Sequence, residues 1–198
     1  KYRDNGYRVE DPNIRFAGRG QIVRDSSIAE NVIDYLKAGE GIEKITDFDP
    51  EIKVSDINPI YPDTFREIAG ICKDNGIRLI VVSAPLPVTE YYDSEYYLRH
   101  RILEQLTDEQ GVEFYDLNMA KEDLYDPDPY GFYDNYHAND IGAKLYTEAL
   151  ADLLNRVDDI VSKGTIDSVK DESINSMFYT WEETCHRAET FLESIGLW

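Results

Sequence analysis

Apolar residues recur at helical spacing in four stretches of the chain, and each stretch ends at or shortly before a glycine. Two of these stretches open with Ser or Thr followed three residues later by Glu, which is the spacing of a capping box. Asn139 is the expected N-cap of the last one. The pattern therefore predicts helices over about residues 27–37, 64–74, 94–110 and 140–163.

Two short runs between these helices have the character of strands. Residues 77–82 are almost continuously apolar and β-branched, as expected for a parallel strand covered on both faces, and residues 112–117 form a second short run. Weaker strand signals occur at 14–16 and 21–23. Alternation of helix and strand predicts an α/β protein with a mainly parallel sheet, in which ligands bind beyond the carboxyl ends of the strands.

The end of the chain carries a different pattern. Apolar residues there alternate spacings of four and three, which is a heptad seam: Ile174, Phe178, Trp181, Cys185, Ala188, Leu192 and Ile195. We expect one amphipathic helix over 174–195 that packs on the α/β part of its own chain, with a homo-oligomer through this helix as the alternative. The expected divisions are an irregular N-terminal region with one helix (1–62), an α/β portion (63–163) and a helical appendage (164–198).

Composition and charge exclude several classes of function. The 198 residues have a formal net charge of -20, and the acidic residues are spread along the chain, so nucleic acid would be repelled over most of the surface. No apolar run is long enough to span a bilayer. The 2 cysteines and 3 histidines have the spacing of neither a disulfide framework nor a metal site, so we expect no metal and no cofactor.

The stretch FYDNYHANDIGAKLY, residues 132–146, places a carboxylate three positions before an imidazole, directly ahead of the last predicted helix. A histidine that acts as a general base in acyl transfer needs a partner, usually a carboxylate, that fixes its tautomer. Asp134 and His137 can meet this need within one turn. Asn139 and Gly142 suit a helix start and close packing that would hold the loop. An Asx turn at Asp134 followed by an exposed histidine is the structural alternative.

The string of Asp134, His137, Asn139, Gly142 and Ala143 resembles the last conserved block of the SGNH (GDSL-like) hydrolase superfamily, in its bacterial extracytoplasmic acyltransferase-like and esterase-like branch. The segment CKDNGIRLIVVSAPLPVTEYY also resembles the penultimate strand of those proteins, and the likeness covers residues 63–157. It implies a flavodoxin-like three-layer sandwich, incomplete here at the N-terminus. It further implies a serine nucleophile, an Asp/His pair as the acid–base pair, and an extracytoplasmic or cell-envelope location. Two lone cysteines are compatible with that compartment or with the cytoplasm, which is the alternative.

The serine block of that family does not occur, because the chain contains neither a GDS nor a GxND motif. Arg24-Asp25-Ser26 is the nearest approximation, which makes Ser26 a candidate nucleophile, with a helix-start role as the alternative. Ser83 follows a predicted strand and is expected in the wall of the site. We therefore expect the C-terminal portion of a longer SGNH-like protein, or a relative that has lost its nucleophile.

Tyrosines gather in the two loops that follow the predicted strands. Tyr91, Tyr92, Tyr133 and Tyr136, together with Asn139, are the predicted substrate-binding residues, because rings with polar tips suit a sugar ring or an acyl chain. Burial of these rings against one another is the alternative. The predicted function is an esterase or O-acyltransferase acting on carbohydrate or cell-envelope acyl esters, with a small-molecule or polysaccharide substrate. A noncatalytic carbohydrate-binding or structural module is the second interpretation.

Overall fold

The structure is a computed structural model that describes residues 14–18, 21–24, 44–126, 131–132, 137–162, 172–194 and 196. Its elements follow in the order β1 (Ile14–Gly18), β2 (Gln21–Arg24), η2 (Val54–Asp56), α2 (Ile60–Asp74), β3 (Ile80–Ser83), α3 (Val88–Tyr91), α4 (Ser94–Gln110), β4 (Glu113–Asp116), η3 (Leu117–Met119), α5 (Asp140–Ser162), α6 (Glu172–Asn175) and α7 (Trp181–Ser194). The helix predicted over 27–37 lies outside the described residues.

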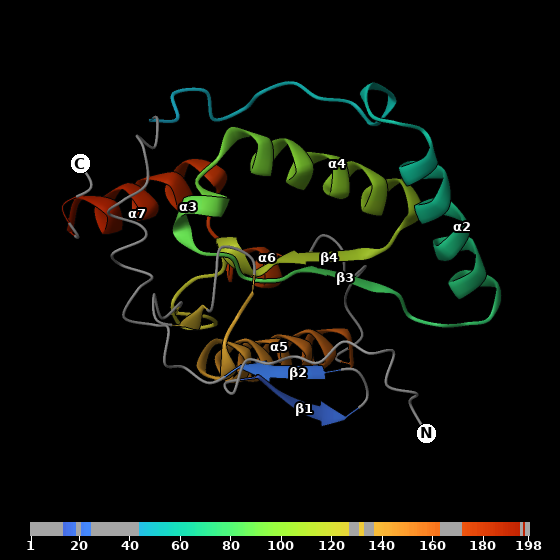
Figure 1. The fold of residues 1–198 in the computed structure, drawn as a ribbon. Coiled ribbons are helices and arrows are strands. Elements are labelled where there is room, and N and C mark those ends of the chain that lie inside the picture. Colours follow the sequence, from blue (N-terminus) through green and yellow to red (C-terminus); the bar gives the residue numbers. More distant parts are fainter. Residues whose placement is uncertain are drawn as a thin grey trace, which may run out of the picture.

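The centre of the fold is a parallel pair of strands between helices. β3 and β4 pair in the register Ile80↔Glu113 to Ser83↔Asp116, and α4 lies on one side of the pair with α5 on the other (Figure 1). Val82 and Tyr115 pack with Leu153 of α5, whereas alternate residues face α4. β1 and β2 form a separate antiparallel pair. The prediction of an α/β protein with parallel strand pairing is confirmed.

The first helix of the α/β portion begins earlier than predicted. α2 starts at Ile60 after Pro59, and the Oδ1 of Asn58 accepts a hydrogen bond from the Ile60 N–H at 3.1 Å. Thr64 lies inside the helix and its hydroxyl donates to the Ile60 carbonyl at 2.6 Å, so the predicted capping box at Thr64 is wrong. The predicted helix end is confirmed by Gly76, whose φ of 64° is left-handed.

The strands are shorter than the apolar runs that predict them. The N–H of Ile77 donates to the Cys72 carbonyl at 2.8 Å, so this residue still belongs to the turn that closes α2, and its side chain is 57% exposed. β3 therefore begins only at Ile80. The following helix matches its prediction closely. Asp93 caps α4 by accepting from the Glu95 N–H at 2.9 Å, and Gly111 ends it.

An ion pair between the exposed Arg78 and the buried Glu113 joins the segment before β3 to the start of β4. Arg78 donates two hydrogen bonds to Glu113, at 2.6 and 2.8 Å, and the Tyr115 hydroxyl donates to the same carboxylate at 2.7 Å. Burial alone would raise the pKa of Glu113, but these hydrogen bonds outweigh it and hold the pKa below the usual value. Since a lowered pKa favours the carboxylate in the folded state, the group stabilises the fold at neutral pH and loses this contribution as the pH falls through its folded pKa.

The predicted single helix over 174–195 is wrong, because the structure divides this segment into α6 and α7. Between them the chain pairs with the segment after β4: the Lys121 N–H donates to the Met177 carbonyl at 2.9 Å and the Tyr179 N–H to the Met119 carbonyl at 2.7 Å. Thr180 then starts α7, since its hydroxyl accepts from the Glu183 N–H while its own N–H donates to the Glu183 carboxylate. The Thr180/Glu183 capping box marks this break in the sequence.

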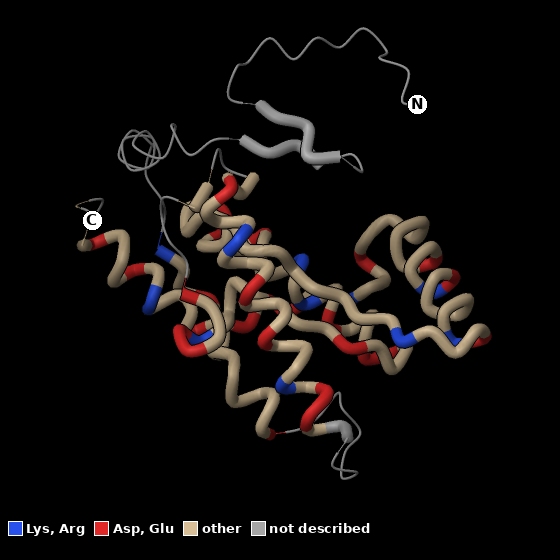
Figure 2. Tube along the Cα trace, turned by 90° about the horizontal axis from the view of Figure 1, so that it is seen from below, with Lys and Arg blue, Asp and Glu red and all other residues tan. Residues whose placement is uncertain are grey.

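The apolar seam of α7 packs on its own chain. Trp181, Cys185, Ala188 and Leu192 are buried in one core with Tyr91, Tyr92, Tyr96 and Tyr97 from α3, α4 and the link between them. The expected packing on the α/β portion is thereby confirmed, and this seam is not available as an oligomer interface. Among the helices described, none combines the length and apolarity that a bilayer crossing requires. Figure 2 shows acidic residues distributed along the described helices and loops, as the sequence indicates.

Candidate functional site

His137 lies in the segment directly before α5, and its side chain is exposed. Two residues later Asn139 is only 2% exposed, and its Oδ1 accepts hydrogen bonds from the N–H groups of Ile141 and Gly142, both at 3.0 Å. The predicted N-cap is therefore confirmed. The burial of the Asn139 amide gives it a structural role that positions His137, whereas its predicted contact with substrate stays a prediction.

A close backbone contact explains the glycine of the motif. A Cβ on Gly142 would lie 1.9 Å from the carbonyl oxygen of Gly131, and the same oxygen accepts a hydrogen bond from the Asn139 N–H at 3.0 Å. Phe132 forms an isolated antiparallel bridge with Ala138. The close-packing role expected for Gly142 is thus confirmed, and the loop is fixed on both sides of the residues between 132 and 137.

Several predicted site residues lie outside the described residues: Asp134, Tyr133, Tyr136 and Ser26. Their roles as orienting carboxylate, substrate-binding rings and nucleophile therefore stay predictions. Of the predicted catalytic residues, His137 alone lies within the described part of the chain.

Tyr91 and Tyr92 are 6% and 3% exposed and belong to the core under α7. Burial raises the pKa of Tyr91 to about 12. The Tyr92 hydroxyl accepts from the Ile45 N–H at 2.9 Å and donates to Glu189 at 2.8 Å, which joins three distant segments. A cavity of about 450 Å³ borders Tyr92 and residues 44–47. The structure thus gives these two rings the packing role considered from the sequence.

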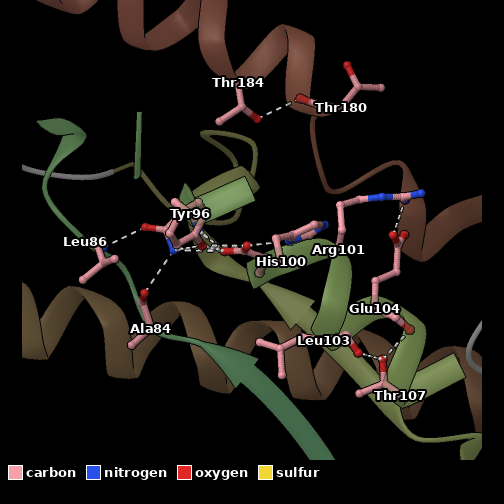
Figure 3. A network of polar contacts seen from close by, with 12 residues as sticks. Ala84, Leu86, Tyr96, His100, Arg101, Leu103, Glu104, Thr107, Thr180 and Thr184 are labelled. Carbon is pink, nitrogen blue, oxygen red and sulfur yellow. Dashed lines mark hydrogen bonds and ion pairs between the residues drawn. The ribbon is translucent and has the colours of Figure 1, made fainter. Parts of the chain in front are cut away.

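A polar network that sequence reasoning missed occupies the carboxyl ends of the strands on the α4 side (Figure 3). At its centre is the buried carboxylate of Asp116, the last residue of β4. It accepts hydrogen bonds from the Tyr96 hydroxyl at 2.7 Å, from the backbone N–H of Asn118 at 3.0 Å and from the Asn118 amide at 2.9 Å. The Nδ1 of His100 lies 2.8 Å from its Oδ2.

These contacts fix the tautomer of His100. A carboxylate that receives hydroxyl and amide donors is an acceptor only, so the proton between Asp116 and His100 sits on Nδ1. The Nε2 of a neutral His100 is therefore a hydrogen-bond acceptor. Burial, reinforced by the charge of Asp116, raises the pKa of Tyr96 far above its usual value, so its hydroxyl stays protonated and donates.

The same network ties the loop after β3 to the end of β4. The amide of Asn118 donates to the Ala84 carbonyl at 3.0 Å and to the Tyr96 hydroxyl at 2.7 Å, while its Oδ1 accepts from the Leu86 N–H at 2.7 Å. Ser83, which pairs with Asp116 across the strands, also hydrogen-bonds to Tyr96. The place of Ser83 in the wall of the His137 site stays a prediction.

One signal in the sequence points to this network. Tyr96 and His100 are four residues apart on one face of α4. Polar Asp116 ends a strand that is otherwise apolar or aromatic on that face, and polar Asn118 follows in η3. Such residues at the carboxyl end of a parallel strand are the usual place for a ligand. Within the described residues, no group of three or more His, Cys, Asp or Glu side chains could hold a metal ion.

The comparisons with known proteins found no matching family model, no matching curated protein and no matching solved structure.

Proposed function

We propose that this chain is an SGNH-type esterase or O-acyltransferase domain that acts on acyl esters of a carbohydrate or cell-envelope polymer. The proposal includes a flavodoxin-like three-layer arrangement around β3 and β4 and a location at the extracytoplasmic face of a bacterial envelope. A polysaccharide or small-molecule ester is the proposed substrate.

One observation carries the proposal. α5 begins at the end of the sheet where β3 and β4 finish (Figure 1), and His137 lies two residues before its Asn139 cap. The close contact between Gly142 and Gly131 holds this histidine segment in place. A general base needs such fixed geometry, because catalysis depends on the distance and angle to the proton that it removes.

In the proposed reaction His137 removes the proton from a serine hydroxyl as that oxygen attacks the acyl carbon. Asp134 orients the imidazole, and the protonated His137 then returns the proton to the leaving sugar oxygen. Water or an acceptor hydroxyl completes the cycle by attacking the acyl-enzyme, again with His137 as the base. The nucleophile is Ser26 or a serine outside these 198 residues.

A noncatalytic carbohydrate-binding module is the second candidate. The feature that favours it is the absence of GDS and GxND motifs from all 198 residues. Such a module keeps the α/β arrangement and its polar pockets but has no activated serine.

Labelling with a serine-directed fluorophosphonate, followed by peptide mass spectrometry, separates these two candidates. With Ser26 as the nucleophile, the esterase proposal predicts labelling of the peptide that contains Ser26, with loss of the label in Ser26→Ala and its retention in the neighbouring control Ser27→Ala. Retention of the label in Ser26→Ala would place the nucleophile at another serine. A chain that binds saccharide but takes no label at any serine has no activated serine of its own, as the noncatalytic module predicts.

A further inference from the structure

One face of α2 exposes large apolar side chains to solvent. Five of the six such side chains in the described part of the chain lie between residues 60 and 77, with exposed fractions of 47% to 68%: Ile60, Tyr61, Ile68, Ile71 and Ile77. Single exposed apolar residues are ordinary, whereas a group of them gathered in one place marks a contact surface. The helix that carries four of them lies at the edge of the molecule, beyond the end of α4 (Figure 1).

A different face of α2 attaches the helix to its own chain. Pro62 and Ala69 are the buried residues of this helix, and Arg66 donates to the Glu109 carboxylate of α4 at 2.8 and 2.9 Å. The described fold therefore packs on the face that holds Pro62 and Ala69, and it leaves the apolar face without a partner.

The exposed residues follow a heptad spacing. Tyr61, Thr64, Ile68 and Ile71 are separated by three, four and three residues, so they alternate between a and d positions, and we call these four residues the α2 stripe. The Thr64 hydroxyl already donates to the Ile60 carbonyl at 2.6 Å, so covering this position leaves no donor without a partner. At a rise of ~1.5 Å per residue, the stripe is about 15 Å long and matches a partner helix of about three turns.

One edge of the α2 stripe is acidic. In this register Glu67 and Asp74 occupy g positions and are exposed, while the half-buried Phe65 and Cys72 occupy e positions. Neither carboxylate has an ion-pair partner among the described residues. Charges at e and g positions select the partner of a helix and its orientation. The stripe therefore favours a helix that carries Lys or Arg beside its apolar residues.

A second copy of the chain does not provide this charge. In an antiparallel pair the g positions of the two copies face each other, so Glu67 and Asp74 would meet carboxylates. In a parallel pair they would face the uncharged Phe65 and Cys72. Each copy also has a net charge of -20, which opposes association. The same charges repel an anionic membrane surface.

We propose that the α2 stripe is a docking surface for a basic amphipathic helix of another protein. Apolar residues of the partner cover Tyr61, Ile68 and Ile71, in the packing of ridges into grooves that two helices adopt. Its Lys or Arg side chains pair with Glu67 and Asp74. The inference uses none of the residues assigned to ester chemistry, so it does not depend on that function.

Isothermal titration calorimetry of the 198-residue chain with three synthetic peptides tests the proposal. The basic peptide LAALKAKLAALKAKL has Leu at a and d positions and Lys at e and g positions. The acidic peptide LAALEAELAALEAEL replaces every Lys with Glu. The scrambled peptide has the composition of the basic one, with its Leu residues distributed around the helix. We expect saturable one-to-one binding of the basic peptide, and binding at least about tenfold weaker for the other two.

Replacing one apolar residue of the stripe tests the apolar contact. Ile71→Ser should weaken binding of the basic peptide about tenfold, because the buried surface of the isoleucine is lost. Ile141→Ser is the matched control, since Ile141 is an exposed isoleucine of α5, and it should leave the affinity unchanged. Circular dichroism shows whether each variant is folded.

Reversing the acidic edge tests the charge contact. Glu67→Lys together with Asp74→Lys should invert the preference, so that the acidic peptide binds more tightly than the basic one. The control changes two exposed residues of α7, Glu182→Lys and Glu193→Lys, and alters the net charge by the same amount. We expect this control to keep the preference of the parent chain for the basic peptide.

Equal binding of the basic and scrambled peptides would reduce the effect to general attraction between opposite charges and would overturn the proposal. Absence of binding, or an unchanged preference in the folded Glu67→Lys/Asp74→Lys variant, would also overturn it. Sedimentation of the chain alone should give a monomer. A dimer that Ile71→Ser dissociates would assign the stripe to a second copy, and co-sedimentation with phosphatidylcholine vesicles that Ile71→Ser abolishes would assign it to a membrane. Either result contradicts the proposed partner.

Discussion

Replacing Gly142 with alanine is expected to destabilise the protein by about 3 kcal/mol, a large effect for the addition of one methyl group. The new Cβ would lie 1.9 Å from the Gly131 carbonyl oxygen and 2.8 Å from its carbon, so backbone atoms have to move apart. The hydrogen bond from the Asn139 N–H to the same oxygen is lost with that movement. Urea unfolding followed by circular dichroism measures the change in the free energy of unfolding.

Gly70→Ala is the matched control for this prediction. Gly70 lies inside α2, and a Cβ there meets nothing within 4 Å. Alanine in a helix interior is favoured over glycine by about 1 kcal/mol, so this variant should be slightly more stable than the parent. Equal effects of the two substitutions would contradict the close contact between α5 and Gly131.

Replacing Asp116 with alanine should cost about 4 kcal/mol, because one substitution removes the acceptor of several buried donors. Tyr96, His100 and Asn118 all direct hydrogen bonds to this largely buried carboxylate, and each would lose it as an acceptor. Asp116→Asn keeps the size but removes the charge, and it should fall between Asp116→Ala and the parent chain.

Asp123→Ala is the matched control on the surface for Asp116→Ala. Its carboxylate is 67% exposed and lies 3.0 Å from Arg156, so Asp123→Ala should cost less than about 1 kcal/mol. Thermal unfolding of both variants at one pH gives the comparison. A loss below 1 kcal/mol for Asp116→Ala would mean that the network is not an integral part of the fold.

Local signals predicted much of the fold because they act within a few residues. Asn139 caps the helix that it is expected to cap, and α4 begins where the pattern predicts. Gly76 and Gly111 end helices with the left-handed backbone that favours glycine. The two strands follow from their apolar runs. The motif glycine Gly142 also has its expected role, since a helix start packed against another backbone leaves no room for a side chain.

The remaining features depend on contacts between distant segments, which a single sequence does not specify. Tyr91 and Tyr92 lie in a tyrosine-rich segment whose composition is typical of a binding loop. They are core residues because α7 packs over them. Nothing in the helical pattern distinguishes His100. Its role depends on the contact with Asp116 of β4, sixteen residues later in the sequence. The heptad pattern likewise continues through the break at Thr180. The break comes from the backbone hydrogen bond between Tyr179 and Met119, and the spacing of apolar residues carries no sign of that contact.

The most direct test of the proposed function is the rate of p-nitrophenyl acetate hydrolysis by the 198-residue chain and two histidine variants. The account predicts hydrolysis above the buffer rate, a loss of about 100-fold or more in His137→Asn, and no change in His186→Asn, whose imidazole is also exposed. A parent rate equal to that of buffer would contradict an activated serine within these 198 residues. Equal rates for His137→Asn and an active parent chain would contradict the role of His137 as the general base.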